Sequence, residues 1–235
     1  YFSRLNEPTV NIVTVEDPVE YQLNGISQVQ VTEKAGLTFA VALRAILRQD
    51  PDIVMIGETR DGETAQIAIQ AALTGHVVLS TIHTNSAPAT ITRLIDMGIE
   101  PFLIASSIVG VIGQRLVRKL CQVSKEAYTP SPELLKNLGI RAEDSKKIVF
   151  YRPKACDECE SGYKGRLSLF EIMVMSDEVA RLTMERAATT VLRKQAVKDG
   201  MVVLLQDGIR KVEQGLTSIE EVLSVATAYD EGIDQ

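Results

Sequence analysis

The chain has 235 residues, of which 45% are hydrophobic, 24% are charged and only 5% are aromatic. This composition is typical of a soluble globular protein with room for one large domain or two small ones. The formal net charge of −6 argues against a nonspecific nucleic-acid binder, which requires a basic face. The longest uncharged stretch, Pro101 to Gln114, is shorter than the roughly 20 apolar residues of a membrane span, so we expect a buried helix there.

Patterns typical of strands and helices alternate from the start of the chain to about residue 120. Three apolar segments have the character of strands: Asn11–Val15, Asp52–Ile56 and Val77–Leu79. Three segments have the periodicity or the capping residues of helices: Leu37–Leu47, Gly62–Leu73 and Ser86–Met97. Strands separated by helices of this length indicate βαβ units, so the pattern predicts an α/β fold with a parallel sheet.

The pattern changes after Leu120. The segment 121–165 contains the three cysteines and has weak periodicity, apart from a short helix expected near Glu133–Leu138. A strand is expected at Arg166–Val174 and helices after it, the last opened by the capping box Ser218-x-x-Glu221. These changes predict a core domain at 1–120, a Cys-containing insertion at 121–165 and a C-terminal helical subdomain at 166–235.

Three predicted strands end in side chains suited to phosphate chemistry. Glu16 and Asp17 follow the first strand, Glu58 follows the second, and Thr81 and His83 follow the third. Because ligands bind at the carboxyl ends of parallel strands, we expect these side chains to meet at one edge of the sheet. Two carboxylates and an imidazole at such an edge can hold a metal ion, orient water and sense a phosphate.

Both carboxylates also have simpler interpretations. The apolar run before Gly57 and Glu58 has the form of a Walker B segment, but Gly57 stands where many ATPases have Asp. Glu58 could therefore be an ordinary solvated carboxylate in a loop. Glu16 beside Asp17 is a reasonable general base, yet Asp17-Pro18 is also a frequent start of a turn.

The chain has two histidines, at opposite ends of the third predicted strand. His83 lies among hydrogen-bonding side chains, so we expect it to be functional, and we expect His76 to be structural. Arginines are the other candidates, because charge on a transferred phosphoryl group requires a cation. We consider Arg48, Arg60 and Arg115, the last at the end of the predicted apolar helix; each could instead form a surface ion pair.

Three long segments resemble the motifs of one protein family. The first, Val13-Thr14-Val15-Glu16-Asp17-Pro18-Val19-Glu20, resembles the Asp box of the secretion ATPase superfamily, which powers type IV pili and type II secretion. The segment Leu43 to Asp52, continued by Gly57 to Thr64, resembles its Walker B box, and Leu73 to Asn85 resembles its His box. The motifs occur in the family's order, and the resemblance extends to about residue 226.

The resemblance implies a RecA-like P-loop NTPase core, here with a partial parallel sheet, that assembles into a hexamer with ATP and Mg²⁺ between subunits. By position, Glu16 would be the general base, Glu58 the Walker B carboxylate, and His83, with His76 less firmly, a sensor of the γ-phosphate. We assign nucleotide binding to five further residues: Asp17, Thr81, Arg48, Arg60 and Arg115. The C-x-x-C at Cys156 and Cys159 favours the pilus-extension and secretion branch over the retraction branch.

The sequence departs from the family at the phosphate-binding loop. It contains no G-x-x-x-x-G-K followed by Ser or Thr, which the resemblance would place just upstream of Tyr1. We therefore expect the chain alone to bind ATP poorly, because the backbone N–H cradle and its lysine are absent from it.

The cysteines are the second departure. Cys156-x-x-Cys159 matches the second half of the family's paired C-x-x-C insertion, but in the first half Cys121 is followed by Ser124 instead of a second cysteine. A structural zinc site requires four ligands. With both histidines assigned to the core, Asp157, Glu158, Glu160 or water would have to complete the site. Zinc at Cys121, Cys156 and Cys159 and a metal-free loop of reduced thiols both stay open.

The leading hypothesis is ATP hydrolysis by a hexameric cytoplasmic motor that powers type IV pilus assembly or type II secretion. The expected partner is an inner-membrane platform protein, through which the motor would be peripheral to the membrane, without direct contact to nucleic acid. The alternative is a non-catalytic assembly module of the same machinery. A DNA-translocating motor is disfavoured by the acidic charge and by the lack of interleaved aromatic and basic residues.

Overall fold

The computed structural model describes residues 2–140, 143, 148–159 and 161–230. The chain forms two compact units. The first unit comprises Tyr1–Thr84, Pro88–Val109 and Met175–Leu192, and the second comprises Asn85–Ala87, Gly110–Val174 and Arg193–Gln235. Among the described residues, every helix is too short or too polar to cross a lipid bilayer.

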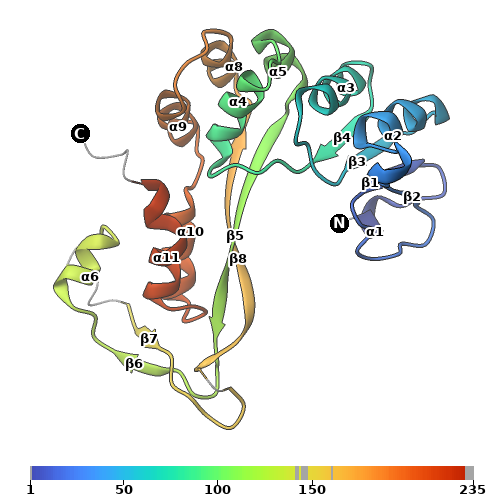
Figure 1. Cartoon of the computed structure of the whole chain (residues 1–235). Helices are drawn as coiled ribbons and strands as arrows, with labels where there is room; N and C mark the ends of the chain where they lie inside the picture. Colours follow the sequence, from blue (N-terminus) through green and yellow to red (C-terminus); the bar gives the residue numbers. More distant parts are fainter. Residues whose placement is uncertain (1, 141–142, 144–147, 160, 231–235) are drawn as a thin grey trace. The chain divides into compact units, whose positions relative to one another are not determined.

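The first unit is built on a four-stranded parallel sheet (Figure 1). Its strands are β1 (Ile12–Glu16), β2 (Ser27–Gln30), β3 (Ile53–Ile56) and β4 (Val77–Ser80), in the order β2-β1-β3-β4. The predicted parallel sheet is thus confirmed. β1 is buried along its whole length, as expected for a central strand of a sheet that is covered by helices.

The first unit contains the helices predicted at 37–47, 62–73 and 86–97, together with further helices. Its helices are α1 (Phe2–Leu5), α2 (Phe39–Ile46), α3 (Gly62–Leu73), α4 (Ala87–Asp96), α5 (Pro101–Ser107) and α8 (Asp177–Met184), with short 3-10 turns at Glu33–Ala35 and Leu47–Gln49. α3 begins where its capping residue predicts, because the Asp61 carboxylate accepts a hydrogen bond from Thr64 N at 2.8 Å. The core joins Val13 and Val15 of β1 to Leu43 and Ile46 of α2.

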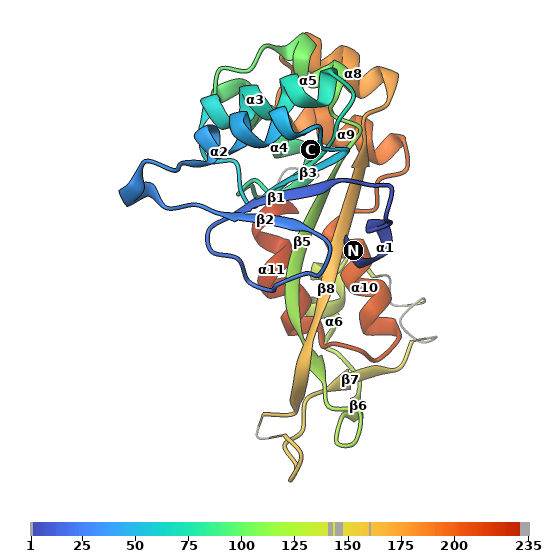
Figure 2. The same cartoon turned by 90° about the vertical axis from the view of Figure 1, so that its right-hand side faces the viewer.

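The second unit is built on a long antiparallel ribbon (Figure 2). β5 (Gly110–Leu120) pairs with β8 (Tyr163–Val174), and α10 (Leu204–Glu213) and α11 (Ile219–Asp230) pack against it. Its core includes Val117, Leu169 and Val222. The insertion contributes β6 (Glu126–Tyr128), paired with β7 (Phe150–Arg152), and α6 (Pro132–Asn137), while α9 (Thr189–Lys198) spans the boundary between the two units.

The predicted helix over Pro101–Gln114 is wrong in its second half. α5 ends at Ser107, Ile108 is extended, and β5 starts at Gly110. The residues Ile108 to Ile112 are β-branched apart from Gly110, which favours a strand once a partner is available. That partner is β8, more than forty positions away in the sequence, so local periodicity could not reveal it. Arg115 therefore lies within a strand and not at a helix end.

The ribbon also explains why the compact units divide the chain differently from the predicted division at 120 and 165. β5 pairs with β8 from Gly110 to Leu120, which joins the end of the predicted core domain to the strand after the insertion. α8, placed by the sequence in the C-terminal subdomain, contacts α5 within the first unit. Sequence periodicity locates elements, but it does not show which elements pack together.

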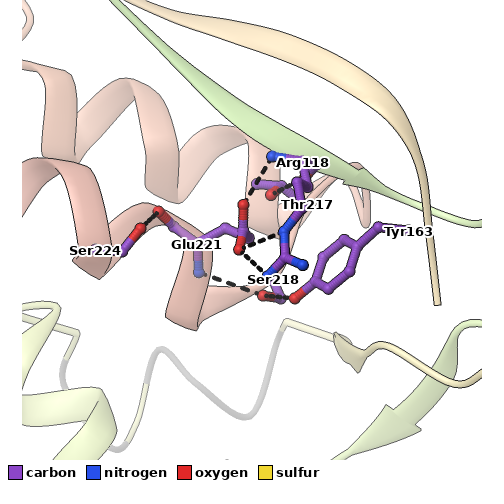
Figure 3. A network of polar contacts seen from close by, with 6 residues as sticks. All are labelled: Arg118, Tyr163, Thr217, Ser218, Glu221 and Ser224. Atoms are coloured by element: carbon purple, nitrogen blue, oxygen red, sulfur yellow. Dashed lines mark hydrogen bonds and ion pairs between the residues drawn. The ribbon is translucent and has the colours of Figure 1, made fainter. Parts of the chain in front are cut away.

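A polar network fixes α11 to β5 within the second unit (Figure 3). Ser218 Oγ accepts a hydrogen bond from Glu221 N at 3.4 Å, which is the first half of the predicted capping box. The Glu221 carboxylate accepts from Arg118 N at 2.8 Å and from Arg118 Nη2 at 2.6 Å. The Arg118 guanidinium stacks 4.1 Å from the centre of the Tyr163 ring, whose hydroxyl lies 2.9 Å from Ser218 Oγ.

Candidate functional site

The carboxylate of Glu16 is held at the carboxyl end of β1. Side chains alternate along a strand, so Thr14 and Glu16 point to the same face of the sheet, opposite to Val13 and Val15. Glu16 is 9% exposed, and its Oε1 accepts a hydrogen bond from Thr14 Oγ1 at 2.6 Å. In the part of the chain that the structure describes, no hydrogen bond or ion pair engages Oε2.

A second donor to Glu16 comes from the neighbouring strand. Gln28 of β2 lies opposite Thr14 in the strand register, and its Nε2 donates to Glu16 Oε1 at 2.9 Å. The same amide is fixed by the loop between β1 and β2, because Leu23 N donates to Gln28 Oε1 at 2.7 Å and Gln28 Nε2 contacts Tyr21 O at 3.0 Å. Gln28 thus orients the Glu16 carboxylate and ties the loop to it.

Gly57 brings the end of β3 against the end of β1. Its N–H donates to Val15 O at 2.7 Å, and a Cβ at this position would lie 3.1 Å from that oxygen and 3.3 Å from Glu16 Cα. A side chain would therefore crowd the backbone next to the candidate base. This close approach gives a physical reason for Gly where many ATPases have Asp, and it places Glu58 at the same edge as Glu16.

Glu58 contacts Arg60 and His83. Arg60 donates to both of its carboxylate oxygens at 2.5 Å, and His83 Nε2 lies 3.4 Å from Glu58 Oε2. The Glu58 side chain is 14% exposed, whereas that of His83 is 89% exposed. Hydrogen bonding and charge from Glu58, with a smaller contribution from Asp17, raise the pKa of the Arg60 guanidinium above its ordinary value. Glu58, Arg60 and His83 therefore lie together, and Asp17 is near enough to Arg60 to contribute to the electrostatic field there.

Hydroxyl groups join the ends of β3 and β4. Thr81 Oγ1 donates to Gly57 O at 2.6 Å, and Thr59 N donates to Thr81 O at 2.8 Å. Thr59 Oγ1 also lies 2.8 Å from Ser80 Oγ. These bonds hold the Glu58 loop and the His83 loop together, so Thr81 has a positioning contact beside the candidate site.

Of the predicted arginines, Arg48 lies at the other end of the sheet and Arg115 lies in the other unit. Arg48 immediately precedes Gln49 and Asp50, whose carbonyls accept from Asn11 Nδ2 at 3.0 Å. Because Asn11 stands before the first residue of β1, Arg48 lies at the amino end of the sheet, opposite to Glu16. Arg115 belongs to the second unit, where its Nη2 donates to Asn85 O at 3.2 Å. The proposed roles of both arginines stay predictions.

His76 is tied to the end of α3. Its Nδ1 lies 2.9 Å from Ala71 O and 3.2 Å from Thr74 Oγ1, and it precedes β4. These contacts are those of a helix-end residue and place His76 at the opposite end of β4 from His83.

The three cysteines meet in the second unit. Cys121 Sγ lies 3.9 Å from Cys156 Sγ, Cys156 Sγ lies 3.3 Å from Cys159 Sγ, and all three sulfur atoms lie within 4.8 Å of one another. The Ser124 side chain lies beside this cluster, with its Oγ 3.5 Å from Cys159 Sγ. A cluster of soft sulfur donors in this geometry fits a zinc ion.

Sequence reasoning missed the residues that position these groups. Thr14 and Gln28 became visible only with the strand register, since their spacing to Glu16 carries no motif of its own. The alternation of polar Thr14 and Glu16 within an otherwise apolar strand was the one available signal.

The family model for the type II/IV secretion system protein matches residues 1–224. The chain belongs to this family. It is 52% identical over 224 residues to the type II secretion system protein E of Xanthomonas campestris, covering 95% of this chain and 40% of that protein. It is 48% identical over 222 residues to the type IV pilus assembly ATPase PilB of Thermus thermophilus, covering 94% of this chain and 25% of that protein.

A solved structure supports the RecA-like fold predicted from the sequence. The pilus retraction motor PilT with bound ADP matches with a TM-score of 0.68 and 26% identity, covering 95% of this chain and 55% of that one. The chain spans less than half the length of the two curated relatives named above. Both are named for type II secretion or pilus assembly and are considerably more similar in sequence than the retraction motor, which agrees with the predicted branch of the secretion ATPase family.

Proposed function

We propose that the chain is the catalytic portion of an ATP-hydrolysing motor that powers type IV pilus assembly or type II secretion. The observation that carries this proposal is the edge formed by β1, β3 and β4, where Glu16 and the Glu58–His83 pair follow adjacent parallel strands. Members of the family with ATPase in their names, and a solved motor with bound ADP, support the same chemistry.

Glu16 is the candidate general base. A carboxylate that accepts two hydrogen bonds on one oxygen is fixed in direction, and the other oxygen can take the proton of an attacking water. Fixing the base before the substrate binds removes much of the entropy loss that would otherwise oppose the reaction.

Glu58 is the candidate carboxylate for Mg²⁺ or for its bound water. Mg²⁺ prefers oxygen ligands and is usually held by one or two carboxylates together with phosphate oxygens, which fits a carboxylate at this edge. When bound, the ion would neutralise charge on the phosphates. Glu58 is held by Arg60 and His83, so these two side chains set its orientation, and His83 is exposed enough to contact a phosphate.

We propose that the three cysteines are ligands of a zinc ion. Four ligands at the corners of a tetrahedron with metal–sulfur bonds of about 2.3 Å would place the sulfurs roughly 3.8 Å apart. The distance of 3.9 Å between Cys121 Sγ and Cys156 Sγ agrees with this value, and that of 3.3 Å between Cys156 Sγ and Cys159 Sγ is shorter. The role of zinc here would be structural, because the cluster joins β5 to the loop before β8.

The remaining parts of the proposal concern the assembled protein. We propose a homo-hexamer in the cytoplasm, with nucleotide bound between subunits and Arg48 available to a neighbouring subunit because it lies away from the Glu16 edge. The force would be passed to an inner-membrane platform protein, which would keep the motor at the membrane without insertion.

The experiment that tests the function is steady-state ATP hydrolysis by the full-length protein that contains this chain. Glu16→Gln and Glu58→Gln together should abolish turnover, because they neutralise both candidate carboxylates with little change of shape. Glu63→Gln is the matched control, since Glu63 is an exposed carboxylate paired with Arg44 on the helices of the same unit. Turnover retained in the double variant, or lost equally in the control, would contradict the proposal.

A further inference from the structure

The zinc proposal leaves one ligand position to be filled. The described acidic residues of the insertion do not fill it: the cluster of potential ligands contains the three cysteines alone, and Glu158 is paired with Lys164 Nζ at 2.8 Å. Asp157, the other described candidate, is exposed. Glu160 lies outside the described residues. Both histidines belong to the first unit. Glu160 and water therefore remain from the candidates named in the sequence, and the described part of the second unit offers one further side chain beside the sulfurs, that of Ser124.

Ser124 is placed against the sulfurs by the turn that follows β5. Lys125 N donates to Cys121 O at 3.0 Å, which closes the turn and brings Ser124 back beside Cys121. The facing loop is closed by a reciprocal pair of backbone hydrogen bonds, both 3.0 Å, between Cys156 and Cys159. Cys121 N donates to Gly162 O at 2.9 Å and so joins the two loops. The four side chains therefore converge because the backbone holds them there.

The distances of Ser124 fit a ligand. With metal–oxygen bonds of about 2.1 Å and metal–sulfur bonds of about 2.3 Å, an oxygen and a sulfur on one tetrahedral zinc lie roughly 3.6 Å apart. Ser124 Oγ lies 3.5 Å from Cys159 Sγ. The Ser124 hydroxyl also donates to Lys154 O at 2.5 Å, and this contact occupies its proton and leaves the oxygen lone pairs free.

We propose that Ser124 Oγ is the fourth ligand of the zinc ion, completing a site of three cysteines and one serine. The hydrogen bond to Lys154 O is the outer-shell contact that orients this ligand, as such contacts do for metal-bound side chains in general. The inference rests on the zinc proposal above and is independent of ATP hydrolysis, because the site lies in the second unit and needs no nucleotide.

The test is metal binding by the purified 235-residue chain, with Zn²⁺ and Co²⁺ as probes. Elemental analysis gives the zinc content, chelator competition gives the affinity, and the Co²⁺ absorption spectrum reports how many thiolates bind. The wild-type chain should hold one zinc. Ser124→Ala should weaken zinc binding by about 10-fold or more, the range seen when one contact of a metal site is lost.

Two further variants separate ligand loss from misfolding. Ser124→Thr keeps the hydroxyl and should retain the wild-type affinity, whereas Ser124→Cys should bind zinc more tightly than wild type and strengthen the thiolate absorption of the Co²⁺ form. Ser161→Ala is the matched control, since Ser161 is an exposed serine of the same insertion. A Ser124→Ala chain with unchanged affinity and an unchanged Co²⁺ spectrum would overturn the serine ligand. Absence of zinc from both the wild type and Ser124→Cys would overturn the zinc proposal itself, and neither result would bear on ATP hydrolysis.

Discussion

Gln28 Nε2 donates a hydrogen bond to Glu16 Oε1 at 2.9 Å, which makes a residue of β2 part of the candidate site on β1. The amide cannot turn freely, because Leu23 N holds its oxygen at 2.7 Å. An oriented amide holds the carboxylate in one direction, and a general base requires such a fixed direction towards the proton that it takes. This hydrogen bond leads to a test of whether Gln28 positions the Glu16 carboxylate for catalysis or only stabilises the fold.

Gln28→Ala should lower kcat for ATP hydrolysis about 10-fold with little change of KM, because Glu16 loses a donor but its charge remains. Gln28→Glu should lower kcat further, because a second carboxylate at this position would repel Glu16 and turn it from its direction as well as remove the donor. Gln30→Ala is the control, as Gln30 is an exposed glutamine of the same strand. Equal losses at all three substitutions, with KM changed as much as kcat, would make Gln28 a structural residue only.

The two histidines should respond in opposite ways to substitution. His83→Gln should reduce kcat by about 100-fold, the scale of a lost electrostatic contact to a transition state, while nucleotide affinity changes little. His76→Gln should leave kcat near the wild-type value, since His76 contacts Ala71 O and Thr74 at the end of α3. Rapid-quench kinetics on both variants of the full-length protein would decide. A larger loss at His76 would reverse the assignment.

Gly57→Asp tests the close approach of β3 to β1. The substitution introduces the residue that many ATPases have, yet a Cβ here would lie 3.1 Å from Val15 O. We expect the chain to lose about 1–3 kcal/mol of its free energy of unfolding, the usual range for an overpacked site, as measured by urea denaturation. Gly36→Asp is a control, because a Cβ at Gly36 meets no atom within 4 Å, although the left-handed φ of 78° adds strain. A fully stable Gly57→Asp chain would show that the two strands can separate at this point.

The Arg118–Glu221 pair predicts a pH dependence of stability. Burial opposes ionisation of Glu221, but hydrogen bonds and charge from Arg118 outweigh it and lower the pKa of the carboxyl below its ordinary 4.5. Because the folded pKa is depressed, the stabilisation is fully present above about pH 4.5 and is lost as the pH falls through the folded value. Acid titration of the free energy of unfolding should show this loss.

Arg118→Ala should remove about 2 kcal/mol near neutral pH, the scale of hydrogen bonds to a charged group, and should weaken the acid dependence. Arg152→Ala is the matched control, because its partner Glu126 is far more exposed than Glu221. It should change the free energy of unfolding by less than about 1 kcal/mol. Identical effects of the two substitutions would mean that the network in Figure 3 contributes no more than a surface ion pair.

Local patterns in the sequence predicted the elements that depend on local physics. α3 begins after Asp61 and ends at Leu73, as its capping residue and its Thr74-Gly75 stop indicate, and three strand ends meet at one edge because βαβ units require it. β5 could not be predicted in the same way. Its strand character depends on pairing with β8, and an apolar run without that partner has the same composition as a buried helix.

The site was predicted in part for the same reason. Glu16, Glu58 and His83 stand at strand ends, where position in the sequence determines position in the fold. Gln28 contacts Glu16 through the strand register, to which no spacing rule applies. Ser124 has the C-x-x-C spacing from Cys121, but its contact with Cys159 depends on how the two loops close. Arg48 could not be placed from the sequence, because its position near a helix end does not show at which end of the sheet it lies. Only the hydrogen bond from Asn11 Nδ2 to Gln49 O, just before β1 begins, places it at the amino end.

The central claim is that Glu16 activates water for attack on ATP, and a single-turnover measurement on the Glu16→Gln full-length protein tests it most directly. The account predicts that ATP binds with an affinity close to that of the wild type while the hydrolysis step slows by about 1,000-fold, within the range attributed to general base catalysis. Hydrolysis of bound ATP at the wild-type rate would contradict the account.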